Sequence, residues 1–113
     1  MHINLKNDGD IFIMELSDEI DLYNSPELRN QLTTAISRGE KKIVIDFANV
    51  KYIDSSGLAT LIEGLQKMNR EKGELKLCAL RQSIRDIFEV ARLDDVFAIY
   101  ETQKDAVNEF KQN

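Results

Sequence analysis

Short apolar runs alternate along this chain with segments whose apolar residues recur at helical spacing. The run Ile43–Phe47 is nearly unbroken, as expected of a central strand buried on both faces. The other segments repeat apolar residues three and four positions apart, which is typical of amphipathic helices. This alternation predicts an α/β fold in which helices pack against a mixed sheet. Predicted strands contain residues 3–5, 11–16, 43–47, 75–79 and 96–100, and predicted helices contain residues 25–36, 58–68, 84–91 and 106–110.

Turn and capping residues predict several element boundaries. Asn7–Asp10 is a turn signal between the first two strands, which predicts a hairpin. Ser25 and the following proline suit an N-cap and a first helical position, and Gly39 suits the C-terminal cap of the same helix. Ser83–Asp86 resembles a capping arrangement for the third helix. The last helix, near 106–110, is expected to be only loosely held.

Length and charge limit the classes of partner. The chain has 113 residues, so we expect a single domain over residues 1–113. Fifteen basic and 20 acidic residues give a net charge of -5, and the basic residues are scattered, which argues against a nucleic acid partner. No stretch approaches the roughly 18 apolar residues of a membrane span, and no signal-like start is present. We therefore expect a cytoplasmic protein with no membrane partner.

The residues that most enzymes and metal sites need are scarce. Cys78 is the only cysteine and lies in an apolar run, so a disulfide within the chain is impossible and a buried, inert thiol is expected. His2 is the only histidine and lies near the N-terminus, where it is poorly placed to act as a base. The sequence also lacks a Gly-x-Ser-x-Gly turn, a P-loop and a Gly-x-Gly-x-x-Gly turn. We expect no catalytic residues, no metal and no cofactor.

One segment could carry function, the polar stretch Asp54–Gly57 between the central strand and the second helix. Ser55 and Ser56 fall in the first turn of that helix, where free backbone N–H groups and the helix dipole favour a phosphate. Asp54 could cap the helix or orient the Ser55 hydroxyl. Gly57 lacks a side chain, which would let a partner approach the backbone. Residue types alone leave capping and modification both open.

The longer segment Ile43–Leu61, with Asp-Ser-Ser-Gly-Leu at its centre, resembles the signature of the STAS family, specifically of bacterial anti-sigma factor antagonists. The likeness continues upstream in Leu16–Asp21 and downstream in Leu75–Ala79 and Ile84–Phe88, so that it covers nearly the whole chain. It implies an α/β STAS fold, a four- to five-stranded mixed β-sheet with four to five α-helices packed mainly on one face. One departure is Asp18, where the family usually has glycine; aspartate tolerates a left-handed backbone better than most residues.

The resemblance also implies a mechanism, partner switching controlled by phosphorylation of Ser55, the first serine after the aspartate. The unphosphorylated form would bind an anti-sigma factor that is also a serine protein kinase of the histidine-kinase-like ATPase class, and so release the sigma factor. Phosphorylation by that kinase would disrupt the complex, and a metal-dependent Ser/Thr phosphatase would restore it. The alternative within the family is a STAS regulator of a target other than a sigma factor, in secretion, biofilm formation or phosphatase control.

The partner surface is expected around Ser55. It would include the loop at 21–25 and positions on the second helix that we expect to be exposed. The predicted partner-binding residues are Asp21, Asn24, Ser25, Asp54, Ser56, Gly57, Thr60, Glu63 and Gly64.

Overall fold

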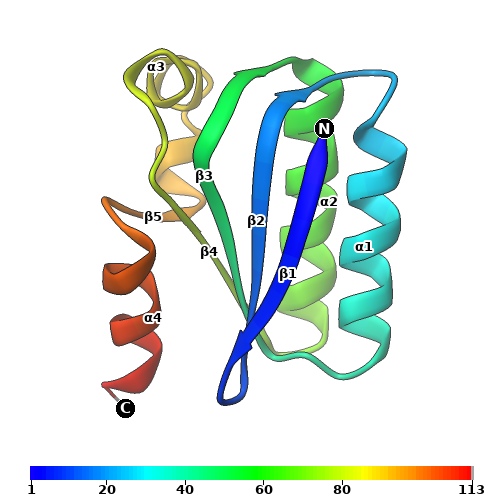
Figure 1. The fold of residues 1–113 in the computed structure, drawn as a ribbon, viewed down its shortest axis with the longest axis vertical. Coiled ribbons are helices and arrows are strands. Elements are labelled where there is room, and N and C mark those ends of the chain that lie inside the picture. The colour runs from blue at the N-terminus through cyan, green and yellow to red at the C-terminus, as the bar shows by residue number, and fades with distance from the viewer. Residues whose placement is uncertain (113) are drawn as a thin grey trace.

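A computed structural model describes residues 1–112, and the chain in it alternates between strands and helices as the sequence predicts (Figure 1). A short 3-10 turn, Leu93–Asp95, precedes the last strand. The strands are β1 His2–Asp8, β2 Ile11–Ile20, β3 Lys42–Ile53, β4 Glu74–Cys78 and β5 Ala98–Tyr100. The helices are α1 Ser25–Ser37, α2 Ser55–Arg70, α3 Gln82–Val90 and α4 Gln103–Lys111.

The five strands form one sheet in the order β1-β2-β3-β4-β5. β1 and β2 are the predicted antiparallel hairpin, whose turn contains Gly9 at a φ of +60°. The pairs β2–β3, β3–β4 and β4–β5 are parallel, with helices in the connections. The predicted mixed sheet is confirmed, and the carboxyl ends of β2 and β3 lie together because these strands are parallel neighbours.

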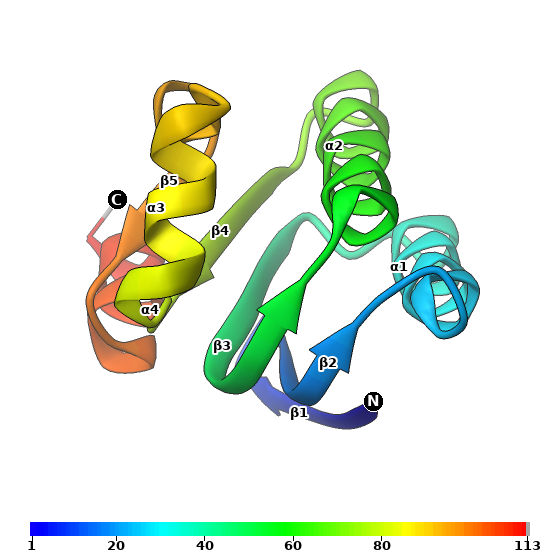
Figure 2. The same ribbon diagram turned by 90° about the horizontal axis from the view of Figure 1, so that it is seen from above.

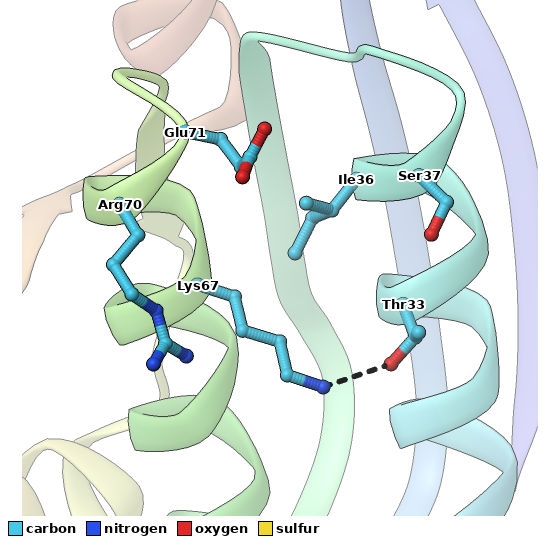
Figure 3. A pocket seen from close by; sticks show the side chains of 6 residues that line it. All are labelled: Thr33, Ile36, Ser37, Lys67, Arg70 and Glu71. Atoms are coloured by element: carbon cyan, nitrogen blue, oxygen red, sulfur yellow. Dashed lines mark hydrogen bonds between the residues drawn. The ribbon is translucent and has the colours of Figure 1, made fainter.

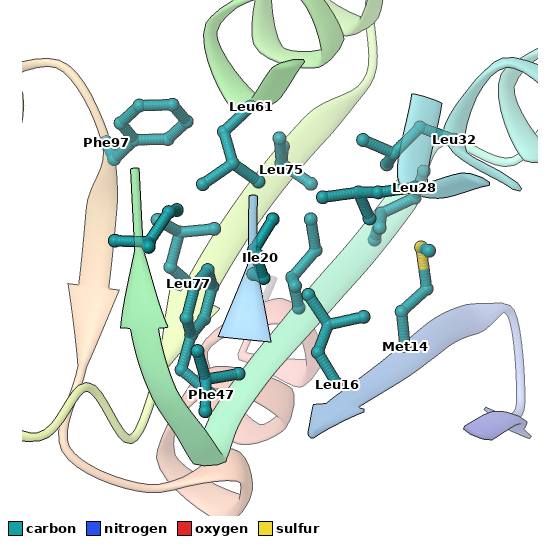
Figure 4. Packing of buried hydrophobic residues seen from close by; sticks show 14 of the residues in the cluster. Met14, Leu16, Ile20, Leu28, Leu32, Phe47, Leu61, Leu75, Leu77 and Phe97 are labelled. Atoms are coloured by element: carbon teal, nitrogen blue, oxygen red, sulfur yellow. The ribbon is translucent and has the colours of Figure 1, made fainter. Parts of the chain in front are cut away.

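The two faces of the sheet carry two separate apolar cores. In β3, Ile43, Ile45 and Phe47 join the larger cluster, whereas Val44 joins the smaller one. The larger cluster lies under α1, α2 and α3, and Figure 4 shows its side chains converging above the sheet. Figure 2 shows α4 apart from α1 and α2, and its apolar residues form the smaller cluster on the opposite face. Three of the four α-helices in residues 1–112 therefore lie on one face, as predicted.

The last helix is packed more firmly than the sequence suggested. Ala106 and Phe110 of α4 are buried against Val44 and Cys78 of the sheet. At the start of the helix, the Gln103 amide donates to carboxylates on β2 and β3, at 2.8 and 2.7 Å. The expectation of a loosely held helix was wrong, because the sheet's second face has an apolar patch that only α4 covers.

Two predicted caps differ from the structure, and one agrees. Helix α1 begins at Ser25 with Asn24 as N-cap, so Ser25 is one position inside the helix. Helix α3 has Arg81 as N-cap, so Ser83 does not cap it. At the end of α1, Gly39 has a φ of +87°, and the N–H groups of Gly39 and Glu40 donate to the carbonyls of residues 36 and 35. This is a Schellman motif, which confirms the predicted glycine cap.

Candidate phosphorylation and partner-binding site

The polar segment after β3 and the loop after β2 meet at the carboxyl end of the sheet. Ile20 and Ile53 are register partners at the ends of the two strands, and the Asp54 N–H donates to the Ile20 carbonyl at 3.0 Å. Figure 1 shows both strands entering their helices at the same end of the molecule. Parallel pairing therefore brings the β2–α1 loop beside the start of α2.

Asp54 links that loop to the helix. One carboxylate oxygen accepts from the Gly57 N–H at 3.1 Å, and the other accepts from the Leu22 N–H at 3.1 Å. The first bond is the N-cap of α2, so the capping role that the sequence left open is present. The second bond fixes the loop against the helix, which the sequence did not predict.

Ser55 lies at the first position of α2 and is exposed, while Ser56 is half-buried behind it. The amides of Ser55 and Ser56 have no carbonyl four residues earlier within the helix, and the positive end of the helix dipole lies there. An anionic group on the Ser55 oxygen would therefore meet backbone donors of its own helix. Asp54 is the one acidic side chain next to Ser55 in sequence, and its charge would oppose such a group at short range.

Asp21 and Asn24 determine the shape of the β2–α1 loop. The Asp21 carboxylate accepts from the N–H groups of Tyr23 and Asn24, at 3.0 and 3.2 Å. In return, the Asn24 side chain accepts from the Asp21 N–H at 2.8 Å and donates to the Glu19 carbonyl at 2.9 Å. These bonds hold Leu22 and Tyr23 at the tip of the loop, where their exposed fractions are 66% and 92%.

Four of the predicted partner-binding residues are buried by the chain itself. Gly57 has no space for a side chain, because a Cβ would lie 2.7 Å from Ile53 and 2.8 Å from Ile20. Its role is to let the helix approach the strand ends, so the expected opening for a partner is absent. Ser25, Thr60 and Gly64 are also buried, the last two on the side of α2 that faces α1.

Glu63, like Ser56, is a member of the predicted set on α2 that stays partly exposed. Its carboxylate forms a 2.7 Å ion pair with Arg29 of α1. The hydrogen bond from Arg29 lowers the pKa of Glu63, so the side chain is charged at neutral pH. The ion pair links α2 to α1, about two turns of helix beyond the start of α2.

Three exposed apolar or aromatic residues in the segments that lead into α1 and α2 were missing from the predicted set. They are Leu22, Tyr23 and, three positions before Ser55, Tyr52, whose side chain is 50% exposed. We call Leu22, Tyr23 and Tyr52 the apolar rim. The signal for Leu22 and Tyr23 was present in the sequence, because they are apolar residues within a polar loop that belongs to no strand or helix pattern.

Asp18, which replaces the glycine usual in the family, has a φ of +68°. The left-handed conformation at this position is therefore kept, as the tolerance of aspartate for it suggested. The β2–β3 pairing shifts register between Asp18 and Glu19, so the residue lies at an irregularity in the strand. Beyond it β2 resumes and reaches Ile20, whose carbonyl receives the Asp54 N–H.

Other kinds of site have little support in the described residues. Cys78 is buried, as predicted, and burial, followed by the charges of Asp46 and Glu15, raises the pKa of its thiol to about 12. Within residues 1–112, no three His, Cys, Asp or Glu side chains are grouped closely enough to hold a metal ion. In the same part of the chain, no helix combines the length and the hydrophobicity needed to cross a membrane.

Comparison with known proteins identifies the family. The STAS domain model matches residues 2–106. The anti-sigma F factor antagonist of Paenibacillus polymyxa is 26% identical over 112 residues, covering 98% of this chain and 96% of that protein. The anti-sigma-B factor antagonist of Staphylococcus aureus is 28% identical over 101 residues, covering 89% of this chain and 94% of that protein.

Solved structures share the fold. The anti-sigma factor antagonist SpoIIAA in its unphosphorylated form superimposes with a TM-score of 0.80 at 18% identity, covering 99% of this chain and 100% of that chain. The phosphorylated form of the Bacillus cell fate determinant SpoIIAA gives a TM-score of 0.78 at 20% identity, covering 96% and 99%. Because the STAS domain model matches residues 2–106 of the 113 in the chain, and the sheet and helices have the same arrangement, this chain belongs to the STAS domain family.

Proposed function

We propose that this chain is an anti-sigma factor antagonist that switches partners through phosphorylation of Ser55. Its partners would be an anti-sigma factor with serine kinase activity of the histidine-kinase-like ATPase class and a metal-dependent Ser/Thr phosphatase, all in the cytoplasm. The chain itself would act by binding, as one domain, and would catalyse no reaction. Relatives named as anti-sigma factor antagonists, and the existence of SpoIIAA in phosphorylated and unphosphorylated forms, support this proposal.

The observation that carries the proposal is the position of one exposed hydroxyl beside an apolar surface. Ser55 is exposed at the start of α2, and Asp54 ties that helix start to the loop with Leu22 and Tyr23. Exposed tyrosine and leucine side chains are common anchors of protein interfaces, because they bury a large area when a partner docks. A kinase that docks on the apolar rim would therefore have the Ser55 hydroxyl within the contact area.

Phosphorylation would act differently on the fold and on the complex. A phosphoserine adds about -1.5 to -2 units of charge and three acceptor oxygens. On the free chain this group is solvated and meets the amides of the first turn of α2, so the fold would persist. In the complex the same group would lose its water against apolar and acidic surroundings, Asp54 among them. A penalty of about 3 kcal/mol would reduce affinity by roughly a hundredfold.

The direct test uses the cognate kinase, sought among neighbouring genes, with ATP and mass spectrometry. Wild-type protein should gain one phosphate on Ser55, and Ser55→Ala should gain none yet still bind the kinase. The matched control is Ser83→Ala, because Ser83 is also exposed in the first turn of a helix, and this variant should be phosphorylated like wild type. An unmodified Ser55 in the presence of an active, bound kinase would refute the proposed switch.

A second test concerns the partner and the apolar rim. Affinity capture with Ser55→Ala should retain the kinase, and Tyr23→Ala should lose most of it without unfolding, because the side chain is 92% exposed. Retention of a regulator with no link to a sigma factor would replace the proposed pathway by the alternative within the family. Undiminished capture by Tyr23→Ala would remove the rim from the interface.

A further inference from the structure

A hollow lies between the C-terminal halves of α1 and α2. It has a volume of about 370 Å³, within the range of small-molecule sites. Figure 3 shows Lys67 reaching across from α2 to α1, where its ammonium group lies 3.5 Å from the Thr33 hydroxyl. Counting about 1.5 Å of rise per residue, Lys67 is roughly 18 Å along α2 from Ser55. The residues around this hollow are Thr33, Ile36, Ser37, Lys67, Arg70 and Glu71.

The hollow lies at a basic end of an acidic protein. Six of the 15 lysines and arginines, all within residues 1–112, form salt bridges, which leaves nine without one. Five of those nine gather at the ends of α1 and α2 and in the turns that follow. They are Arg38, Lys41, Lys67, Arg70 and Lys72.

The two cations that line the hollow, Lys67 and Arg70, lie in the last turn of α2. Basic residues in a last turn stabilise a helix by neutralising its terminal carbonyls. Lys41 adds a third cation at this helix end, and its ammonium group donates to the Glu71 carbonyl at 2.6 Å. Lys67 instead turns toward the Thr33 hydroxyl of the neighbouring helix. Two cations and the hydroxyls of Thr33 and Ser37 therefore border one space, with the apolar side chain of Ile36 among them.

We propose that this hollow binds a small phosphate monoester that carries hydroxyl groups. Lys67 and Arg70 would take the phosphate, since a guanidinium group matches two phosphate oxygens and an ammonium group adds a point charge. Thr33 and Ser37 would donate hydrogen bonds to the same group. Glu71, which follows Arg70 at the end of α2 in Figure 3, repels a bare anion but accepts from a sugar hydroxyl. The source is either a soluble sugar phosphate or a lipid headgroup with a terminal phosphate.

The test is a titration of isotope-labelled protein, followed by NMR, with glucose 6-phosphate as the probe and glucose as the uncharged control. Saturable shifts should appear at the amides around Thr33, Ser37, Lys67 and Arg70 with the phosphate ester, and none with glucose. Lys67→Gln and Arg70→Gln should each weaken binding by about tenfold or more, as expected for a lost charge-assisted hydrogen bond. Lys72→Gln removes a charge at the same end without altering the hollow's lining, and should bind like wild type.

Co-sedimentation with vesicles of phosphatidylcholine, with and without phosphatidylinositol 4-phosphate, separates the two sources, because this headgroup carries both a terminal phosphate and free hydroxyl groups. Binding to phosphatidylinositol 4-phosphate vesicles that Lys67→Gln abolishes identifies a headgroup, and saturable binding of glucose 6-phosphate identifies a soluble ligand. No binding in either experiment, or equal loss in Lys72→Gln, would overturn the proposal. Lys67→Gln should leave Ser55 phosphorylation unchanged, so failure here is distinct from failure of the proposed switch.

Discussion

Replacing Gly57 by alanine tests whether close packing holds the start of α2 in place. The added Cβ would lie 2.7 Å from Cγ1 of Ile53 and 2.8 Å from Cγ2 of Ile20, closer than real contacts of this kind. Both isoleucines are buried, at 2% and 0% exposure, and the atoms concerned are next to their branched β-carbons. Neither side chain can rotate away without disturbing the strand ends, so the helix start itself must move.

The size of the effect follows from two opposing contributions. Overpacking of this kind costs about 1–3 kcal/mol. Alanine has a higher helix propensity than glycine, which stabilises a helix interior by up to about 1 kcal/mol and the first turn by less. We therefore expect Gly57→Ala to lower the free energy of unfolding by about 1–2 kcal/mol, measured by urea denaturation.

Gly64→Ala is the matched control in the same helix. Its Cβ would lie 3.0 Å from Cδ1 of Leu32, the far end of a flexible side chain, and 3.9 Å from Cδ2 and Cγ of the same residue. That methyl group can shift, and the gain in helix propensity offsets the remaining cost, so we expect a change within about 0.5 kcal/mol. The packing argument for Gly57 fails if Gly57→Ala is as stable as wild type, or if Gly64→Ala lowers the free energy of unfolding by more than Gly57→Ala does.

Three further predictions follow from other contacts. Asp54→Ala removes the cap and the bond to Leu22, which should cost about 1–2 kcal/mol by urea denaturation and accelerate hydrogen exchange at the Leu22 amide; unchanged exchange would contradict the link. The hydrogen bond from Gln103 is the largest of the causes that lower the pKa of Glu15 from 4.5 to about 2. The ionised Glu15 therefore stabilises the fold fully above about pH 4.5, and this contribution is lost progressively as the pH falls toward 2. The stability difference between wild type and Gln103→Ala should shrink over that interval, and a difference that grows on acidification would be inconsistent. The thiol of Cys78 should react with a disulfide reagent only as fast as the protein unfolds, and rapid labelling of the native state would count against its burial.

Much of the fold follows from the sequence because local signals and burial agree. The central strand, the helix that begins at Ser55 and the glycine cap at Gly39 each have a distinct pattern, and the structure confirms all three. The firm docking of α4 was not predicted, because the patch that it covers consists of single residues, such as Val44, on the second face of strands that already looked buried. Periodicity indicates that both faces of a strand are covered but does not identify which element covers each.

The exposure of the predicted partner-binding residues was anticipated only in part, and the reason is similar. Thr60 and Gly64 were assigned to the surface, yet both face α1. Small and weakly polar residues indicate little about which side of a helix is buried, since close helix packing favours them too. Tyr52 was missed because it lies beyond the apolar run at 43–47; in the structure β3 extends to Ile53, and at Tyr52 it pairs with β2 alone.

The two tyrosines of the apolar rim allow partner binding to be followed by intrinsic tyrosine fluorescence, without a label. The chain contains no tryptophan and three tyrosines, so its near-ultraviolet emission comes from phenol rings alone. Two of those rings are exposed, Tyr23 in the β2–α1 loop and Tyr52 near the end of β3, while the Tyr100 ring lies beside the Lys76 ammonium group. Docking of a protein on the rim would change the surroundings of the first two rings, and phenylalanine substitution at each would assign the signal.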